Sequence, residues 1–224
     1  MMGVKTRDLA ILFVSGMDGD TRRYRCFHQQ EQLAMAGLRS MFCESHDPQV
    51  LANVLAYDVF VLHRVPYSRL IEAVIDLAHL RGKPVVFETD DLVFEPEIYE
   101  HIGFTDTLSP QAARQFRRDL HGQAKTFERC DCVLAATDFL AREARDKGKT
   151  AFVHRNAPSE EMIEISERAF AARCQRLDAR IERDHPLEVG YFSGTGSHDR
   201  DFGTISEPLI WMLETYPHAA LHIS

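Results

Sequence analysis

The chain has 224 residues and a formal net charge of −8, from 34 acidic and 26 basic side chains. This is longer than one ordinary domain of ~150 residues, so the length predicts one complete domain and part of another. The basic residues are scattered along the sequence and form no run that would attract a nucleic-acid backbone. The charge pattern therefore argues against nucleic acid as a partner.

The cysteine pattern favours a reduced, cytoplasmic compartment. The five cysteines are an odd number, they include no Cys-X-X-Cys pair, and no histidine cluster has zinc-ligand spacing. Buried free thiols and the absence of a metal site are the expectation. The apolar run from Leu9 to Val14 is short and no cleavage site follows it, so it reads as a first strand. No stretch approaches the ~18 apolar residues of a membrane span, and any membrane contact would be peripheral.

Strand-like apolar runs alternate with longer helical patterns along most of the chain, which is typical of βαβ units and a parallel sheet. Predicted strands are 9–15, 38–43, 59–62, 84–87, 132–135 and 151–153. Predicted helices are 24–35, 48–55, 68–80, 110–129 and 138–147. Residues 95–109 contain Pro96 and Gly103 and no sustained period, so we expect a long loop there. These elements predict a Rossmann-like, doubly wound α/β domain over residues 1–158.

The last part of the chain differs in kind. Residues 159–185 predict a long charged helix and linker that connects two domains, with Glu160 and Glu161 at its positive N-terminal end. A βα pattern then restarts, with a strand over 188–192, a helix over 204–214 and a strand over 219–223. Such a short βαβ unit cannot bury both faces of its own sheet. We therefore expect residues 186–224 to be the truncated start of a second lobe.

The most prominent polar feature is the pair Asp90 and Asp91, in the segment KPVVFETDDLVF. A continuous apolar run suits a parallel strand covered on both faces, and ligands bind outside the carboxyl ends of such strands. The two carboxylates could accept hydrogen bonds from hydroxyl groups, act as a general base or hold a cation. Because no third ligand occurs nearby, we favour the first two roles. The alternative is that an aspartate here only caps the next helix.

Three other loops are rich in polar groups. Residues 16–25 combine Gly16 and Gly19 with arginines before a helix, which suits a phosphate or carboxylate, although a solvated surface turn is the alternative. His154, Arg155 and Asn156 follow the sixth strand, and they could instead be a paired surface cluster. Residues 190–202 hold the glycines, hydroxyls and titratable groups Gly194, Thr195, Gly196, Ser197, His198, Asp199 and Asp201. The alternative for that loop is that Asp199 or Asp201 caps the following helix.

Several enzyme classes lack their motifs in this chain. No Gly-X-Ser-X-Gly elbow occurs, so a nucleophilic triad is not supported. The loop GMDGDT after the first strand is not the Gly-X-Gly-X-X-Gly fingerprint of dinucleotide enzymes. A phosphoacceptor receiver domain would carry its paired acids after the first strand, whereas these follow the fourth.

Five segments together resemble two-lobed glycosyltransferases of the GT-B type, most closely the group 1 (GT4-like) bacterial enzymes. They are RRYRCFHQQEQLAMAG, VVFETDDLVF, ATDFLAREA, HRNAP and VGYFSGTGSHDRDF, and the resemblance extends over nearly the whole chain. It implies transfer of a sugar from a nucleotide-sugar donor to a hydroxyl acceptor in glycan synthesis. It further implies an N-terminal lobe that binds the acceptor, a C-terminal lobe that binds the donor, and no required cofactor or metal.

The resemblance also implies roles for individual residues. Asp90, Asp91 and His198 are the candidate catalytic residues. Asp90 and Asp91 would face the acceptor or the sugar, together with Arg23, Tyr24 and Arg25. Asn156 matches the asparagine that follows the sixth strand. The first loop of the donor lobe, near the phosphates, would contain Gly194, Thr195, His198, Asp199 and Asp201. We expect the aspartate pair and the His198 loop to face one shared groove.

The chain departs from the family in one respect, because the acidic donor-binding motif and most of the second lobe would lie beyond Ser224. This chain alone is therefore expected to be an incomplete and inactive enzyme that binds nucleoside diphosphate sugars weakly. A different reading is a non-catalytic sugar-binding, nucleotide-binding or scaffolding module with a Rossmann-like fold. An unrelated nucleotide-dependent enzyme is a third reading.

Overall fold

The computed structural model describes residues 9–102, 105, 108–178, 187–192 and 199–223. The chain divides into two compact units, residues 1–159 and 160–224. The strands of the first unit are β1 (Ala10–Ser15), β2 (Arg39–Glu44), β3 (Val59–His63), β4 (Val85–Thr89), β5 (Cys132–Ala135) and β6 (Thr150–Val153). Its helices are α1 (Asp20–Arg22), the π-helical η2 (Arg23–Phe27), α2 (His28–Met35), α3 (Gln49–Asn53), α4 (Arg69–Leu80), α5 (Pro96–Ile102), α6 (Pro110–Arg129) and α7 (Asp138–Asp146).

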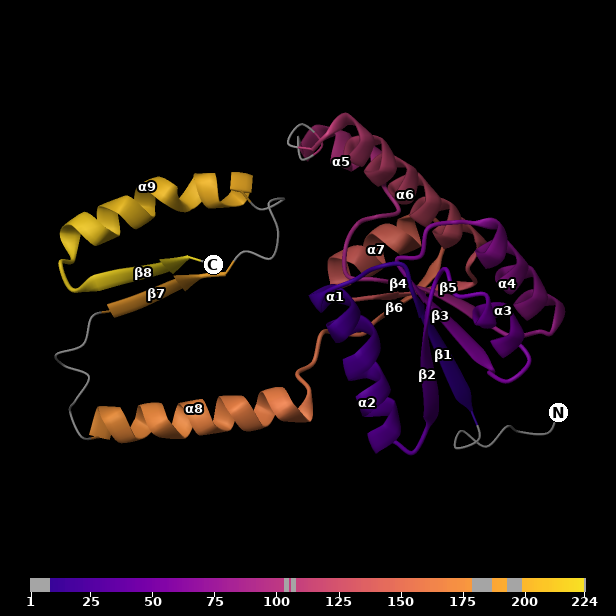
Figure 1. Ribbon diagram of the computed structural model, residues 1–224, viewed down its shortest axis with the longest axis horizontal. Coiled ribbons are helices and arrows are strands. Elements are labelled where there is room, and N and C mark those ends of the chain that lie inside the picture. The colour runs from indigo at the N-terminus through magenta and orange to yellow at the C-terminus, as the bar shows by residue number, and fades with distance from the viewer. Residues whose placement is uncertain (1–8, 103–104, 106–107, 179–186, 193–198, 224) are drawn as a thin grey trace. The chain divides into compact units, whose positions relative to one another are not determined.

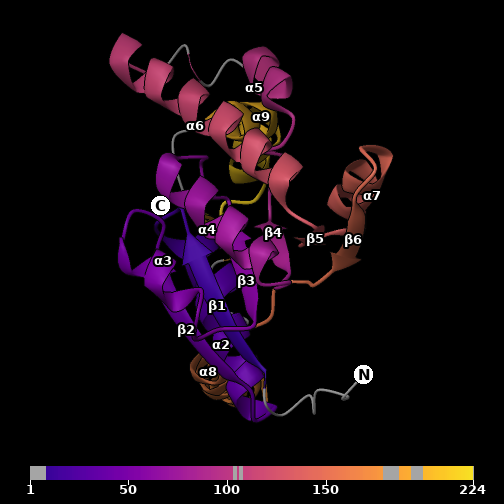
Figure 2. The same cartoon turned by 90° about the vertical axis from the view of Figure 1, so that its right-hand side faces the viewer.

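The strands of the first unit form one parallel six-stranded sheet in the order β2-β1-β3-β4-β5-β6 (Figure 1). The chain moves one way from β1 to β2 and then the opposite way from β3 onwards. Because βαβ crossovers are right-handed, this reversal places the helix between β1 and β2 on one face and the later helices on the other. Figures 1 and 2 show α2 on one side of the sheet and α3 and α4 on the other. The predicted doubly wound, Rossmann-like α/β fold is confirmed.

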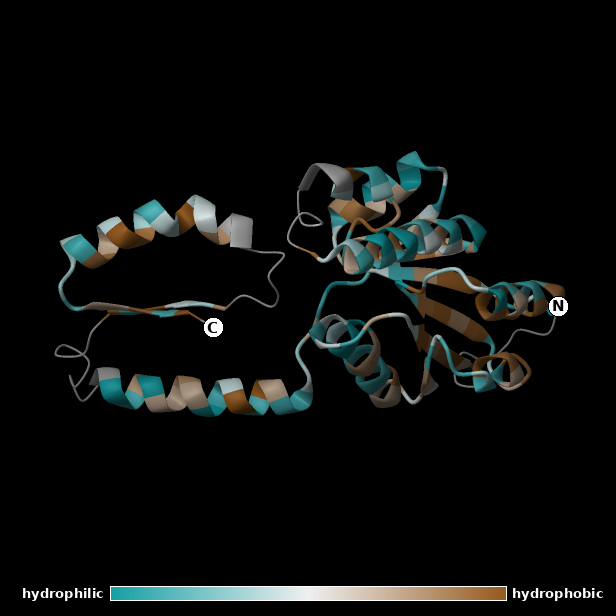
Figure 3. Cartoon of the chain, turned by 45° about the horizontal axis from the view of Figure 1, so that its top comes forward, coloured by the Kyte–Doolittle hydropathy of each residue, from teal (hydrophilic) through white to brown (hydrophobic). Residues whose placement is uncertain are grey.

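Two clusters of apolar side chains hold this unit together. The larger lies under α3, α4, α6 and α7, and it includes Leu62 and Phe87 of the sheet and Ile75 of α4, all fully buried. The smaller joins Phe13 and the other strand residues of the opposite face to Cys26 of η2. Figure 3 shows the strands as the most hydrophobic part of this unit and the helices as mixed. The apolar runs of the sequence are therefore buried on both faces, as in parallel sheets generally.

Helix ends follow local signals closely. The hydroxyls of Ser68, Ser109 and Thr137 accept hydrogen bonds from the backbone N–H of the third residue of α4, α6 and α7. Gly37 and Gly82 follow α2 and α4 with φ of 75° and 65°, which suits glycine after a helix.

Two predicted elements of the first unit need correction. The first helical segment begins at Asp20 instead of Tyr24, and its middle turn is π-helical. Residues 96–102, predicted to be part of a long loop, form helix α5, whose Tyr99 ring packs edge-on against Phe116 of α6 with centroids 5.8 Å apart. Packing on a neighbouring helix stabilises this short helix, which has little periodic pattern of its own.

The basic residues are less evenly distributed in space than along the sequence. The outer face of α6 carries exposed basic side chains at helical spacing, namely Arg114, Arg118, His121, Lys125 and Arg129. Three of them have partners inside the unit, and Arg118 donates to Gln115 Oε1 of the same helix at 2.6 Å. Arg129 bonds Asp76 at 2.5 Å, and the Lys125 ammonium lies 4.0 Å from the centroid of the Tyr67 ring.

The second unit contains α8 (Glu160–Asp178), β7 (Leu187–Tyr191), α9 (Asp199–Thr215) and β8 (Ala219–Ile223). Strands β7 and β8 pair in parallel, with Val189 opposite Leu221. The Tyr191 ring packs against Phe202 of α9 with centroids 4.8 Å apart. Helix α9 begins at Asp199, five residues before the predicted position, so that Asp199 and Asp201 belong to its first turn. No helix in the described ranges is long and apolar enough to cross a membrane.

Candidate functional site

A row of polar side chains crosses the sheet at its carboxyl end. Ser15 of β1 is in register with His63 of β3, and His63 is in register with Glu88 of β4. Residues in register on neighbouring parallel strands point to the same face, here the face covered by η2. The strand order reverses beside β1, and ligands of open α/β sheets bind at such a reversal. The row therefore marks the candidate site.

A buried ion pair connects η2 to the sheet. Arg25 and Glu88 are both 0% exposed, and Arg25 Nε donates to Glu88 Oε1 at 2.5 Å while its Nη2 contacts the same oxygen. Arg25 Nη1 also donates to the backbone oxygen of His154 at 2.7 Å and to Asn156 Oδ1 at 2.9 Å. Burial raises the pKa of the Glu88 carboxyl, and the charges of His63 and Arg25 oppose that rise. One guanidinium thus fixes the loop after β6 to β4.

The imidazole of His63 is fully buried between hydroxyl and carboxyl groups. Its Nδ1 lies 3.0 Å from Ser15 Oγ, and its Nε2 lies 3.2 Å from Thr21 Oγ1 and 3.7 Å from Glu88 Oε2. A serine, a histidine and an acid in contact could suggest a hydrolase triad. However, Ser15 is 1% exposed and its hydroxyl already contacts the backbone nitrogen and oxygen of Met17 at 3.1 and 3.0 Å. This hydroxyl is buried and already hydrogen-bonded within its own turn, which does not fit the exposed nucleophile of a triad.

Asp90 is hydrogen-bonded to the polar network around His63, which comprises Ser15, Thr21, Arg25, His63, Arg64, Glu88 and Asp90 itself. Thr21 Oγ1 donates to its Oδ2 at 2.6 Å, and Arg64 Nη1 donates to its Oδ1 at 3.3 Å. Burial acts to raise the pKa of Asp90, but the His63 ring, the Arg64 charge and the Thr21 hydroxyl outweigh burial and hold that pKa well below its usual range. Asp90 is therefore ionised at neutral pH and is a weak base.

Asp91 is the accessible member of the pair. Its side chain is 50% exposed, against 19% for Asp90, and its Oδ2 lies 3.7 Å from Arg64 Nη2. The Thr89 hydroxyl holds its backbone, by donating to the Asp91 oxygen at 2.5 Å and accepting from the Asp91 nitrogen at 3.1 Å. Neighbouring aspartates thus have different environments, and only Asp91 presents a carboxylate to solvent with its backbone fixed.

Arg64 has an unusual backbone at this site. Its φ is 46°, a left-handed value that is uncommon for arginine and costs of order 1 kcal/mol or more. Gly16 packs against this turn, and its N–H donates to the backbone oxygen of His63 at 3.0 Å. A Cβ on Gly16 would lie 2.6 Å from the Arg64 oxygen and 2.6 Å from Pro66 Cδ. The strained turn aims the Arg64 side chain at both aspartates.

We expect Gly16→Ala to destabilise the protein by about 1–3 kcal/mol, because the new methyl group forces the Arg64 turn to move. The Gly203→Ala variant is the matched control, since no atom lies within 4 Å of a Cβ there and the position is helical. Urea unfolding of both variants checks this. An equal stability of the two variants would mean that the close approach of Gly16 to Arg64 is unimportant.

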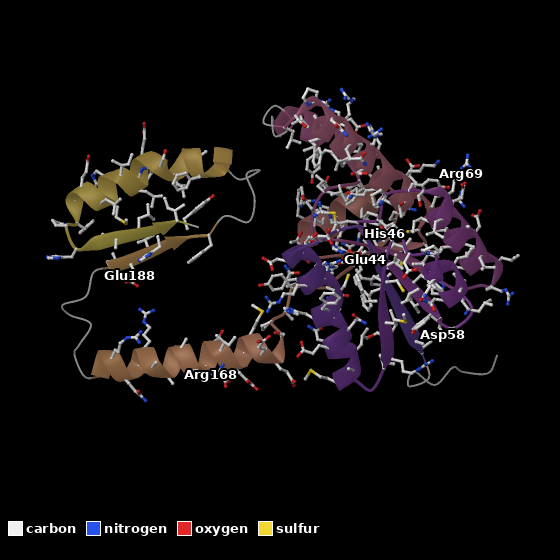
Figure 4. The ribbon with its side chains drawn as sticks, in the orientation of Figure 1. Glu44, His46, Asp58, Arg69, Arg168 and Glu188 are labelled. Carbon is white, nitrogen blue, oxygen red and sulfur yellow. The ribbon has the colours of Figure 1, made fainter. Side chains whose placement is uncertain are left out.

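A polar hollow adjoins the network at the ends of β1 and β2. It has a volume of about 330 Å³ and is lined by residues 15–18 and by Glu44, Ser45 and His46. Figure 4 shows Glu44 and His46 at this end of the sheet and Asp58 at the opposite end. Arg22 contacts Glu44 and bonds Asp18 at 3.0 Å, and its guanidinium lies 5.5 Å from the Phe42 ring centroid. The hollow offers carboxylates and backbone groups that suit a ligand with hydroxyls.

The structure brings some predicted site residues together. Arg25 bonds Asn156, which is exposed, and the network joins Arg25 to Asp90 through Glu88 and His63. Arg25 itself was predicted to face a ligand, but it is fully buried because the Glu88 carboxylate in the sheet needs a counter-charge. Its neighbours remain nearer the surface: Arg23 is exposed and Tyr24 is partly buried.

The remaining predicted site residues belong to the second unit. Gly194, Thr195 and His198 lie outside the described residues. Asp199 and Asp201 lie in the first turn of α9. The groove predicted between these groups and the aspartate pair stays a prediction.

Sequence reasoning missed five residues of the network: Ser15, Thr21, His63, Arg64 and Glu88. Glu88 had a recognisable signal, because it is a charged residue inside a strand of otherwise apolar character, and buried charges require partners. His63 likewise ends an apolar strand. In the part of the chain that the structure describes, no group of three or more His, Cys, Asp or Glu is placed to hold a metal ion.

Fold and site together define a parallel α/β protein with a polar site at the strand-order reversal. No protein-family model matches the chain, and no curated protein matches it in sequence.

Solved structures with a similar arrangement include the UDP-GlcNAc 2-epimerase of Neisseria meningitidis bound to UDP-GlcNAc. It is 11% identical in sequence, and the match covers 96% of this chain and 65% of that chain, with a TM-score of 0.48. The S. aureus MnaA–UDP structure is 10% identical in sequence. The match covers 96% of this chain and 62% of that chain, with a TM-score of 0.47. LpCGTa in complex with UDP is 10% identical in sequence. The match covers 84% of this chain and 60% of that chain, with a TM-score of 0.45. The chain spans less than two thirds of the length of each.

Proposed function

We propose that the protein is a glycosyltransferase of the GT-B type, which transfers a sugar from a nucleotide-sugar donor to a hydroxyl acceptor. One observation carries the proposal: at the carboxyl end of the sheet the network around His63 leaves Asp91 as the more accessible carboxylate, and Ser15 of that network also lines a polar hollow. The motifs RRYR, DDLVF and HRNAP supply the residues of this end of the sheet, and they are the motifs that resemble the family.

The chemistry of glycosyl transfer fits a carboxylate in this position. The acceptor oxygen forms a bond to the anomeric carbon of the donor sugar while the bond from that carbon to the diphosphate breaks, and the acceptor hydroxyl loses its proton. Asp91 is the more exposed carboxylate of the pair, and we assign it to orient the hydroxyl and accept its proton; its Oδ1 accepts from the Leu92 N–H at 2.9 Å and its Oδ2 lies 3.7 Å from Arg64 Nη2. Positioning and support of the leaving diphosphate supply the rest. No bound cofactor is needed, because the donor is already activated.

The acceptor is proposed to lie against the first unit. The hollow beside Glu44 and Asp18 is large enough for a sugar ring, and its polar groups can exchange hydrogen bonds with hydroxyls. Asn156 would contact the substrate through its amide NH₂, because its Oδ1 is occupied by Arg25. The donor phosphates are proposed to lie near the loop that contains Gly194, Thr195 and His198.

The proposal is tested by incubating the protein, in its natural length, with a panel of nucleoside diphosphate sugars with and without glycan acceptors. Release of the nucleoside diphosphate and the acceptor mass are followed together. We expect release that depends on the acceptor, and an acceptor mass increased by one glycosyl residue. Release without acceptor modification, or a reaction only with NAD, would contradict sugar transfer. Tight binding without any turnover would instead support a non-catalytic module.

A further inference from the structure

The hydrogen bonds around His63 have directions that the chemistry of the groups determines. The ionised carboxylate of Asp90 can only accept, so the Thr21 hydroxyl donates its single hydrogen across the 2.6 Å contact with Oδ2. Thr21 Oγ1 then has only lone pairs to offer His63 Nε2, which lies 3.2 Å away. His63 Nε2 must therefore carry a hydrogen and donate it to Thr21.

We infer that Thr21 and His63 are positioning residues that form a directed chain, from His63 Nε2–H to Thr21 and from the Thr21 hydroxyl to Asp90, and that this chain separates the roles of Asp90 and Asp91. The chain occupies one Asp90 oxygen, and Arg64 occupies the other at 3.3 Å. Asp90 is thereby held ionised and immobile. Asp91 is left as the exposed carboxylate of the pair, held by the Leu92 N–H at 2.9 Å and by a longer contact with Arg64 at 3.7 Å.

The surroundings of the imidazole support this direction. The groups that face His63 come from every element packed on it: Ser15 of β1, Thr21 of α1, Glu88 of β4 and Asp90 after β4. Two carboxylates, Glu88 Oε2 at 3.7 Å and Asp90 Oδ1 at 3.9 Å, lie on the Nε2 side of the ring. Negative charge there favours a hydrogen on Nε2. Glu88 Oε2, at 3.7 Å, is beyond hydrogen-bond distance of Nε2, so it adds its charge without accepting that hydrogen.

The functional consequence rests on the proposed function. If Asp90 were not held ionised, the two carboxylates that share Arg64 would titrate as a coupled pair, and the pH dependence of Asp91 would no longer belong to that residue alone. Thr21 is thus expected to affect the pH dependence of catalysis without touching the substrate.

The test compares Thr21→Val, which keeps the shape but removes the hydroxyl, with Thr21→Ser, which keeps the hydroxyl. The carboxyl signal of Asp90 is followed by ¹³C NMR during acid titration. In Thr21→Val we expect the Asp90 midpoint to rise by about one pH unit, the effect of losing a hydrogen bond to a charged group. Thr21→Ser should behave as wild type. An unchanged midpoint in the valine variant would overturn the inference.

A second measurement uses the wild-type protein and does not depend on how the variants fold. Long-range ¹H–¹⁵N spectra of the histidine rings report which nitrogen of His63 carries a hydrogen at neutral pH. We expect a protonated Nε2, and a bare Nε2 would overturn the directed chain. Neither measurement needs a substrate. Failure of this inference is therefore distinct from failure of the transfer assay.

Discussion

Replacement of Arg25 by methionine should destabilise the protein by about 3–5 kcal/mol, because it leaves the Glu88 carboxylate buried without its counter-charge. The same change removes the donor to the His154 oxygen and to Asn156, so the loop after β6 should also exchange its amide hydrogens faster. Equilibrium unfolding in denaturant measures the first effect, and hydrogen exchange of residues 154–157 measures the second.

Two further variants show whether the stability loss in Arg25→Met comes from the unpaired charge of Glu88. The double variant Arg25→Met with Glu88→Leu removes both charges, and it should recover much of the lost stability, since apolar pairs can replace a buried ion pair. Arg155→Met removes an arginine from the exposed pair with Asp138, and it should leave stability close to wild type. If Arg25→Met costs no more than Arg155→Met, the pair does not anchor η2.

Asp91→Asn is expected to lower turnover by about 100-fold or more, the usual effect of removing a positioned base. Its stability should stay near wild type, because the side chain is half exposed and its contact with Arg64 is long, at 3.7 Å. The transfer assay gives the rate, and thermal unfolding gives the stability.

Asp90→Asn is the informative comparison for this prediction. It should lower stability as well as turnover, because Arg64 and Thr21 lose an ionised partner. Asp76→Asn, in an exposed pair with Arg129, is the control for removing a surface carboxylate. Unchanged turnover in both Asp90→Asn and Asp91→Asn would mean that these aspartates only shape the turn after β4.

Local signals in the sequence were sufficient for most of the first unit. Helix α6 runs from Pro110 to Arg129 as predicted, since a serine cap and an N-terminal proline mark its start. The first helix could not be predicted as well, because its buried face includes Arg25, which a hydrophobic pattern treats as polar. Helix α5 depends on a neighbouring helix, which is a tertiary effect that no local pattern contains.

The location of the candidate site was predictable from the sequence, but the contacts among its residues were not. The carboxyl end of the fourth strand was expected to hold polar chemistry, and Asp90 and Asp91 lie there. The partnership of Ser15, His63 and Glu88 depends on strand order and register, which a single sequence does not specify. The difference between Asp90 and Asp91 depends on Thr21 and Arg64, which are distant in sequence.

The central claim is that substrate binds at the carboxyl end of the six-stranded sheet. Backbone amide NMR during titration with a hydroxyl acceptor and a nucleoside diphosphate sugar tests this most directly. The account predicts that the largest shifts will fall on residues 16–22, 64–65, 90–92 and 154–157. Shifts confined to the outer face of α6, or to the amino ends of the strands near Asp58, would contradict it.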